Sequence, residues 1–197
     1  MSTRDRILDG AAEVMRNRGL ANTTTKEIAR AAGLSEAMLY KVFRDKVDLF
    51  LGVLNERLPR ITVLSGGLAE NPGTAPLHVD LRRLAAELLS FYLESFPIAA
   101  SVFSDPALLV RHRDAVRERG TGPHVVVEGV AAYLSAEQRA GRVGPAVSPD
   151  VVAELLVGAC LHRAFLIRFA GESTTPNRIE RFAGQIITAL EPALAGS

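Results

Sequence analysis

The segment GLSEAMLYKVF, residues 33–43, decides how the N-terminal part of the chain folds. Its apolar residues Leu39, Val42 and Phe43 recur at helical spacing, which predicts a short helix that buries this face. The opposite face carries an aromatic ring and two cations, and it consists of Ala37, Tyr40, Lys41 and Arg44. A helix whose only role is to pack in a core does not need an aromatic ring and two cations on its exposed face. The flanking segments indicate what this face is for.

These flanking segments predict a second helix joined to the first by a tight turn. Thr24 begins a capping-box sequence, which predicts a helix over residues 24–32. Gly33 permits a turn with positive φ, and Ser35 is predicted to cap the helix over residues 36–43. Two helices joined by a short glycine turn form a helix-turn-helix, whose second helix normally enters the major groove of DNA.

A helix-turn-helix gives the polar outer face a function in contacting the DNA backbone. Lysine and arginine neutralise phosphates, hydroxyl groups donate to phosphate oxygens, and the amides at a helix start favour anions. The predicted phosphate contacts are Thr24, Lys26, Tyr40, Lys41, Arg44 and Lys46. Each has a purely structural alternative: the threonine is a helix cap, the tyrosine packs at the rim of the core, and the cations are solvated surface charges.

The start of the second helix is where base edges would be read. Glu36 could accept a hydrogen bond from a cytosine amino group, and Ala37 or Met38 could contact a thymine methyl group. Ser35, at the cap of this helix, completes the predicted DNA-binding set. The alternative for Glu36 is that the helix dipole alone favours a carboxylate in the first turn.

The longer segment ANTTTKEIARAAGLSEAMLYKVFRDKVDLF, residues 21–50, resembles the DNA-binding signature of the TetR family of transcriptional regulators. The resemblance covers roughly residues 3–55. Ala37 replaces the family's frequent glycine and changes the base-facing surface, so no operator sequence is carried over. Val42 replaces a frequent histidine and alters packing. The matching positions are Thr23, Thr24, Ile28, Ala29, Ala32, Gly33, Leu34, Ser35, Leu39, Tyr40, Phe43 and Lys46.

The rest of the chain predicts an all-α protein. Apolar residues are 48% of the 197 residues, and they recur at spacings of three and four rather than two. Asp45 is predicted to cap a further helix over residues 46–58. After a loop at residues 65–76, longer helices are expected over residues 77–96, 106–119 and 124–140, with a shorter turn at residues 98–103. We expect a helix-turn-helix domain of three helices over residues 1–50. The resemblance implies that residues 51–197 form a larger helical bundle that binds a ligand and dimerises.

The last two predicted helices, over residues 149–170 and 178–194, suit a dimer interface. The first is apolar nearly all round, as expected of a helix that is buried on several sides. Gly158 and Gly184 would let helices approach closely. Two helices from each subunit would then form a four-helix bundle with isologous contacts. The alternative is an ordinary core helix in a monomer.

The middle helices carry aromatic residues that could line a pocket for a small molecule. Pockets between bundle helices have apolar walls and few polar groups. The resemblance implies an effector pocket and a repressor that its ligand releases from DNA, and the apolar lining favours a hydrophobic or amphipathic ligand. The alternative is that these residues only build the core. The predicted ligand-binding residues are Phe91, Tyr92, Phe103, Val127, His162 and Phe165.

Charge and composition leave few other functional classes. The net charge is +1, but residues 1–60 hold 11 basic against 8 acidic residues, so the positive charge lies at the helix-turn-helix. With Cys160 as the single cysteine no internal disulfide is possible, and neither a signal peptide nor a transmembrane helix is predicted. We therefore expect a cytoplasmic protein with double-stranded DNA, a small effector and a second subunit as partners, and no membrane association.

Two other functional classes are an enzyme with a helical fold and a helix-turn-helix protein that is not a ligand-controlled repressor. No phosphate-binding loop, metalloprotease motif, nucleophile elbow or dinucleotide fingerprint occurs, so no enzyme activity, cofactor or metal is predicted. Cys160 is expected to be an inert core thiol. The second class keeps the helix-turn-helix but makes the protein an activator or a protein-interaction module. The modest charge of the N-terminal segment leaves this alternative open.

Overall fold

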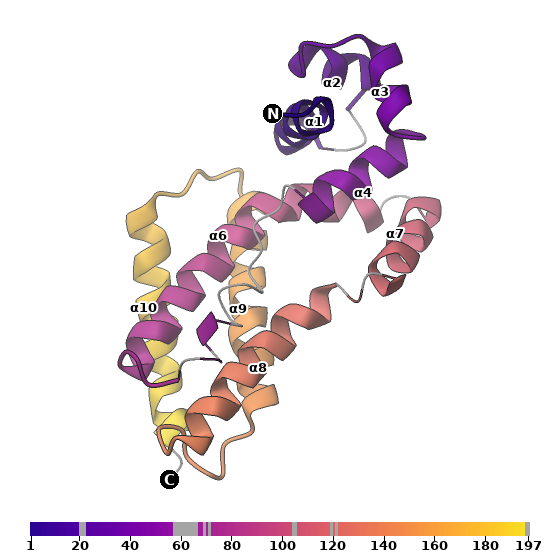
Figure 1. Cartoon of the computed structure of the whole chain (residues 1–197). Coiled ribbons are helices and arrows are strands. Elements are labelled where there is room, and N and C mark those ends of the chain that lie inside the picture. The colour runs from indigo at the N-terminus through magenta and orange to yellow at the C-terminus, as the bar shows by residue number, and fades with distance from the viewer. Residues whose placement is uncertain are drawn as a thin grey trace. The chain divides into compact units, whose positions relative to one another are not determined.

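The computed structural model describes residues 1–19, 23–56, 67, 68, 70, 72–103, 106–118, 120 and 122–195. These residues form helices and no strand (Figure 1), which confirms the predicted all-α class. The helices are α1 (Thr3–Arg18), α2 (Thr25–Ala31), α3 (Glu36–Val42), α4 (Lys46–Glu56), α6 (Leu77–Phe103), α7 (Pro106–Glu118), α8 (Pro123–Arg139), α9 (Pro149–Phe169) and α10 (Pro176–Ala195).

The chain divides into two compact units. One contains Met1–Pro59 and Glu94–Gly120, and the other contains Arg60–Leu93 and Thr121–Ser197. The sequence predicts a boundary after residue 50, between a DNA-binding and a ligand-binding domain. This functional boundary stays a prediction. The structure adds that α7 belongs to the same compact unit as the helix-turn-helix.

The N-terminal unit packs α1 against α2 and α4. Ile7, Leu8 and Phe50 are completely buried in its core. Gly10 of α1 lies so close to α2 that an added Cβ would approach the Ala32 nitrogen to 2.8 Å. A larger residue at this position would push the two helices apart and tilt the helix-turn-helix on its supporting helix.

The C-terminal unit is a helical core built from α8, α9, α10 and the first part of α6. Its interior also holds a polar group. The buried hydroxyl of Tyr133 donates to Asp80 at 3.3 Å, and the fully buried Glu137 is paired with Arg142. Burial and the two carboxylates raise the pKa of Tyr133, so this side chain remains a neutral donor. A buried carboxylate needs such partners because an unpaired charge is costly in a low-dielectric interior.

Two segments differ from the sequence-based prediction. The helix from residue 77 was expected to end at Phe96, before a separate turn, but α6 continues through Pro97 to Phe103. Residues 67, 68 and 70, expected to be loop, are helical, and Leu68 packs against the C-terminal core. The predicted end of the helix that starts at Lys46, residues 57 and 58, lies outside the described residues.

Candidate nucleic-acid interface

The capping box that the sequence predicts at the start of α2 is confirmed. The Glu27 amide donates to Thr24 Oγ1 at 3.2 Å, and the Thr24 amide donates to the Glu27 carboxylate at 3.1 Å. These two bonds satisfy backbone donors that would otherwise lack partners at the helix start. They fix the orientation of the Thr24 side chain, while Lys26 in the first turn remains exposed.

The turn between α2 and α3 is the tight glycine turn that the sequence predicts. Gly33 has φ +64°, a conformation that other residues rarely adopt. The Leu34 amide donates to the Ala29 carbonyl at 2.9 Å, and Arg6 of α1 donates to the Ala32 carbonyl at 2.9 Å. The arginine thus ties the turn to α1 and fixes the direction in which α3 leaves it.

The second helix of the motif, α3, buries one side and exposes the other. Leu39 and Phe43 are each 2% exposed, as predicted. Ser35 occupies the cap position but its side chain makes no capping hydrogen bond, so the prediction of a side-chain cap is wrong. The Ser35 backbone carbonyl instead accepts from the Met38 amide at 3.0 Å, which starts the helix without the hydroxyl.

The outward side of α3 carries the residues predicted to meet DNA. Ala37 and Lys41 are exposed, Tyr40 is 53% exposed, and Met38 is half-buried. The structure adds a contact that the sequence did not reveal, between α3 and Thr25 of α2. The Thr25 hydroxyl bonds to the Glu36 carboxylate, and the Tyr40 hydroxyl lies 3.5 Å from Thr25 Oγ1. Glu36 is therefore anchored to α2 rather than free to swing toward a base.

The start of α4 forms the second part of this surface. Asp45 caps the helix as predicted, because its Oδ1 accepts from the Asp48 amide at 2.9 Å. Lys46 is the first residue of α4, so its charge adds to the positive end of the helix dipole. The Arg44 side chain is 77% exposed next to this helix start. The arrangement presents cations and backbone amides together, which is the chemistry of a phosphate site.

A further arginine reaches this helix start from α7. Arg111 Nη1 lies 3.1 Å from Asp45 Oδ2. Burial raises the pKa of the Asp45 carboxyl, but the Asp48 amide and the Arg111 guanidinium outweigh it and hold that pKa below its usual value. No sequence pattern indicates this pair, because its members are 66 residues apart.

Known proteins that are similar to this chain are transcriptional regulators. Residues 7–53 match the family described as bacterial regulatory proteins, tetR family. The helix-turn-helix transcriptional regulator YvkB of Bacillus subtilis is 27% identical over 167 residues, which cover 83% of this chain and 84% of YvkB. Residues 7–53 are therefore a TetR-family DNA-binding domain. The matched residues span α1 to α4, the elements that build the surface just described.

Solved structures show that the TetR-family likeness extends to the fold of the whole chain. A TetR-family regulator from Mesorhizobium loti superposes with a TM-score of 0.77 at 20% identity, covering 97% of this chain and 96% of that one. FadR of Bacillus subtilis, solved in complex with stearoyl-CoA, superposes with a TM-score of 0.68 at 13% identity, covering 93% and 96%. These structures show the fold, while the family match over residues 7–53 and the relative YvkB indicate a DNA-binding regulator and not an enzyme.

The predicted ligand-binding residues of this chain fall into two groups. Phe91 and Tyr92 have ring centroids 5.1 Å apart and pack, with Val127, against the C-terminal core. Burial, helped by Cys160, raises the pKa of Tyr92 to about 12, so its hydroxyl is a neutral group in an apolar setting. The structure brings these three residues to one core, and their contact with a ligand stays a prediction.

The other predicted ligand-binding residues lie at the surface. His162 is exposed and Phe165 is 40% exposed on α9, where the Phe165 ring lies 5.7 Å from that of Phe169. Phe103 is 74% exposed and belongs to the N-terminal unit. Their assignment to the ligand stays a prediction of the sequence.

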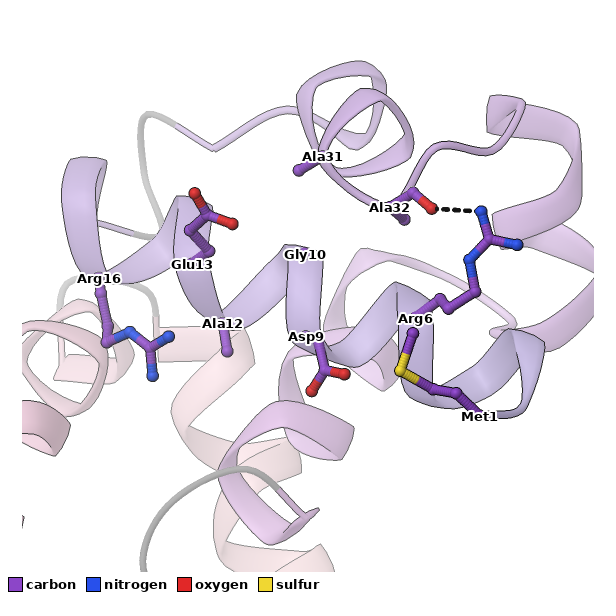
Figure 2. Close-up of a pocket in the computed structure, with 9 residues that line it drawn as sticks. All are labelled: Met1, Arg6, Asp9, Gly10, Ala12, Glu13, Arg16, Ala31 and Ala32. Atoms are coloured by element: carbon purple, nitrogen blue, oxygen red, sulfur yellow. Dashed lines mark hydrogen bonds between the residues drawn. The ribbon is translucent and has the colours of Figure 1, made fainter.

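A surface pocket of about 540 Å³ lies in the N-terminal unit, away from the predicted DNA contacts. Figure 2 shows the Arg6 side chain reaching from α1 to the Ala32 carbonyl beside it. Two basic side chains, Arg6 and Arg16, and two acidic ones, Asp9 and Glu13, line its wall, so it favours neither a cation nor an anion. Sequence reasoning missed it because its residues come from the α1 surface and the end of α2. The lining residues are Met1, Arg6, Asp9, Gly10, Ala12, Glu13, Arg16, Ala31 and Ala32.

The described residues carry no feature of a metal site or a membrane span. No group of three or more histidine, cysteine, aspartate or glutamate side chains within them could hold a metal ion. Within the described helices, no stretch has both the length and the apolar character needed to cross a bilayer.

Proposed function

We propose that this TetR-family regulator is a cytoplasmic, homodimeric repressor that binds a palindromic operator and is released by a hydrophobic or amphipathic effector. The observation that carries the proposal is the exposed surface of α3 and the start of α4, where cations surround a helix start. In this proposal Tyr40, Lys41 and Arg44 contact phosphates on one side of the major groove. Thr24 and Lys26 contact the other side, since they lie at the start of the neighbouring helix α2.

Base reading is assigned to the first turn of α3. Ala37 is exposed and small, so a base edge can approach it closely. Met38 is half-buried, and its flexible side chain suits contact with a thymine methyl group. The Ser35 hydroxyl makes no capping hydrogen bond, so it can form a hydrogen bond with DNA. Glu36, held by Thr25, could read a cytosine amino group only from a fixed position.

The dimer is proposed to form mainly through α9, with α10 beside it. Side chains at alternating spacings of four and three line one side of α9, and most are exposed apolar groups. Leu155 is 58% exposed and Phe169 is 81% exposed, although large exposed apolar patches are rare on monomers. At Gly158 an added Cβ would meet nothing within 4 Å, which leaves room for a partner helix. This face consists of Val151, Leu155, Gly158, His162, Phe165 and Phe169.

An amphipathic effector is favoured by the chemistry of the candidate pocket wall and by one fold relative. Phe91, Tyr92 and Val127 would supply apolar surface, and the neutral Tyr92 hydroxyl would supply a polar contact. FadR of Bacillus subtilis was solved with stearoyl-CoA, a molecule of this amphipathic class. His162 and Phe165 lie on the proposed dimer face, so a ligand that reached them would contact the region where two subunits meet.

Release from DNA requires that the effector bind the DNA-incompetent conformation more tightly than the competent one. A ligand with equal affinity for both conformations would shift nothing, however tightly it bound. By linkage, operator DNA must then weaken effector binding by the same factor. Reciprocal weakening is therefore the signature of an inducer in this protein.

The proposal is tested by titrating the protein against a labelled DNA fragment from upstream of its own gene, with fluorescence anisotropy at several salt concentrations. Saturable binding that falls steeply with salt is expected. Tyr40→Phe and Lys46→Ala should each weaken it, by about two- to tenfold for one phosphate contact. Arg139→Ala, which removes an exposed charge at the end of α8, serves as the control and should leave affinity unchanged.

An absence of binding has three causes to distinguish: the protein does not bind DNA, the fragment lacks the operator, or a retained ligand holds the DNA-incompetent conformation. The protein is therefore also unfolded, stripped and refolded, and then used to select from genomic fragments. Failure of both experiments would contradict the proposed function.

A further inference from the structure

We propose that Arg111 of α7 is a positioning residue for DNA binding: it holds the Asp45 carboxylate, and so leaves Arg44 available to a DNA phosphate. The inference rests on the proposed DNA-binding function. It extends that function to a residue outside the helix-turn-helix, on a helix that the sequence assigns to the ligand-binding domain.

The geometry at Asp45 places two guanidinium groups beside one oxygen atom. Oδ1 of Asp45 is engaged by the Asp48 amide at 2.9 Å. Oδ2 lies 3.1 Å from Arg111 Nη1 and 3.7 Å from Arg44 Nε. Both guanidinium groups are within ion-pair distance of this oxygen, but only Arg111 is within hydrogen-bond distance, so Arg111 is its closer partner.

The two arginines differ in how they are held. Arg111 is 35% exposed, and its helix is anchored in the N-terminal core by Leu108, which is 3% exposed. Figure 1 shows α7 beside α4 within this unit. Arg44 is 77% exposed and lies between the end of α3 and the start of α4. Arg111 is thus held in place by its helix, whereas the exposed Arg44 side chain can contact either the Asp45 carboxylate or a DNA phosphate.

The charges around the start of α4 make this choice matter. Asp45 and Asp48 are carboxylates beside a surface that must attract phosphates. If Arg111 withdrew, the Asp45 oxygen would lose its partner, and Arg44 would need to move less than an ångström to replace it. DNA would then lose a phosphate contact without any change in the fold of the helix-turn-helix. A small displacement of α7 relative to α4 would therefore lower DNA affinity.

The first test compares two single variants of α7 by operator titration. Arg111→Ala should weaken DNA binding about fivefold, a loss typical of one partly exposed ion contact. The slope of affinity against salt should fall by about 0.9, the value expected for one phosphate contact. Arg113→Ala removes the same charge from an exposed position on the same helix and is the matched control. Equal weakening by both variants would overturn the proposal, because bulk charge would then explain the effect.

The second test asks whether the loss runs through Asp45. Asparagine is also a good helix cap, so Asp45→Asn keeps the bond to the Asp48 amide while removing the charge that attracts Arg44. In Arg111→Ala/Asp45→Asn, affinity and salt slope should return to wild-type values. A double variant no better than Arg111→Ala would overturn the proposal, provided circular dichroism shows that both are folded.

The third test asks whether Arg44 is the residue that changes partner. Arg44→Ala should weaken binding in the wild-type background but have little further effect in the Arg111→Ala background, where Arg44 has already left the DNA. Fully additive losses would overturn the proposal. If the wild-type protein bound no operator at all, the proposed function would fail, whereas wild-type binding with additive variants would reject only the role of Arg111.

Discussion

At the scale of single residues, the environment of Cys160 determines whether its thiol can react. Cys160 was predicted to be an inert core thiol, and the structure confirms that it is completely buried in the C-terminal core. Burial raises the pKa of its thiol to about 12. Because the thiolate is the reactive form, this cysteine should resist modification in the folded protein.

We therefore predict that Cys160 reacts with a thiol reagent at pH 8 only after denaturation. The thiol is almost wholly protonated at that pH in the folded state, and the surrounding core also blocks access. In the unfolded chain its pKa should return to the ordinary value near 8.5 and the reaction should be fast. The measurement is the rate of absorbance change with a chromogenic disulfide, with and without guanidinium. A fast reaction of the native protein would contradict the buried position.

Local residue patterns predicted two of the three helix caps, Ser35 being the exception, but not the long-range partners. Thr24, Gly33 and Asp45 were assigned correctly, because capping and positive φ depend on neighbours within a few positions. The Thr25–Glu36 and Arg111–Asp45 pairs were missed. Their members meet only after the helices have packed, and nothing in the sequence pairs one polar residue with another at such separations.

At the scale of helices, α6 shows how tertiary structure overrides a local signal. Pro97 has no amide hydrogen, so the carbonyl four residues earlier, that of Leu93, loses its helical donor. The sequence therefore predicted a helix end. In the structure the Leu93 carbonyl accepts from Arg168 Nε of α9 at 2.8 Å and from a second nitrogen of the same guanidinium. A side chain thus replaces the missing backbone donor and the helix continues.

This account predicts a coupled loss of stability. Arg168→Met should lower the free energy of unfolding by about 2 kcal/mol, because the Leu93 carbonyl is left without a partner on a residue only 5% exposed. In a Pro97→Ala background the new amide can bond to Leu93, so the cost should fall by about 1 kcal/mol or more. Urea unfolding of the four proteins measures this, with Arg139→Met as a surface control. Equal costs in both backgrounds would show that Arg168 acts in some other way.

Helix positions elsewhere were predicted closely, whereas the assignment of residues to a ligand pocket stays a prediction. Apolar spacing and caps located α8, α9 and α10 to within a few residues, because each buries a continuous stripe. The same stripes could not separate core from ligand wall. Tyr92 and Phe165 are both aromatic residues within predicted helices, yet one packs on the core and the other is exposed on α9. Only the packed structure distinguishes them.

For the whole molecule, we propose that specific DNA binding through the helix-turn-helix depends on dimerisation through the C-terminal helices. One recognition helix contributes few base contacts, and two held about one DNA turn or a multiple apart contribute enough for specific binding. The exposed face of α9 is the surface proposed to hold the subunits together. If so, breaking that face should abolish tight operator binding even though α3 and α4 are untouched.

The most direct test is to measure mass and operator affinity together for the wild type, Leu155→Asp and Val79→Asp. The two substituted residues are both exposed and apolar, but Val79 lies on α6, outside the proposed face. Light scattering should give a dimer for the wild type and Val79→Asp, and both should bind the operator with two subunits per site. Leu155→Asp should be a folded monomer with at least about 100-fold weaker binding, since one half-site remains. A monomeric wild type that binds tightly, or a Leu155→Asp variant that still dimerises and binds, would contradict the account.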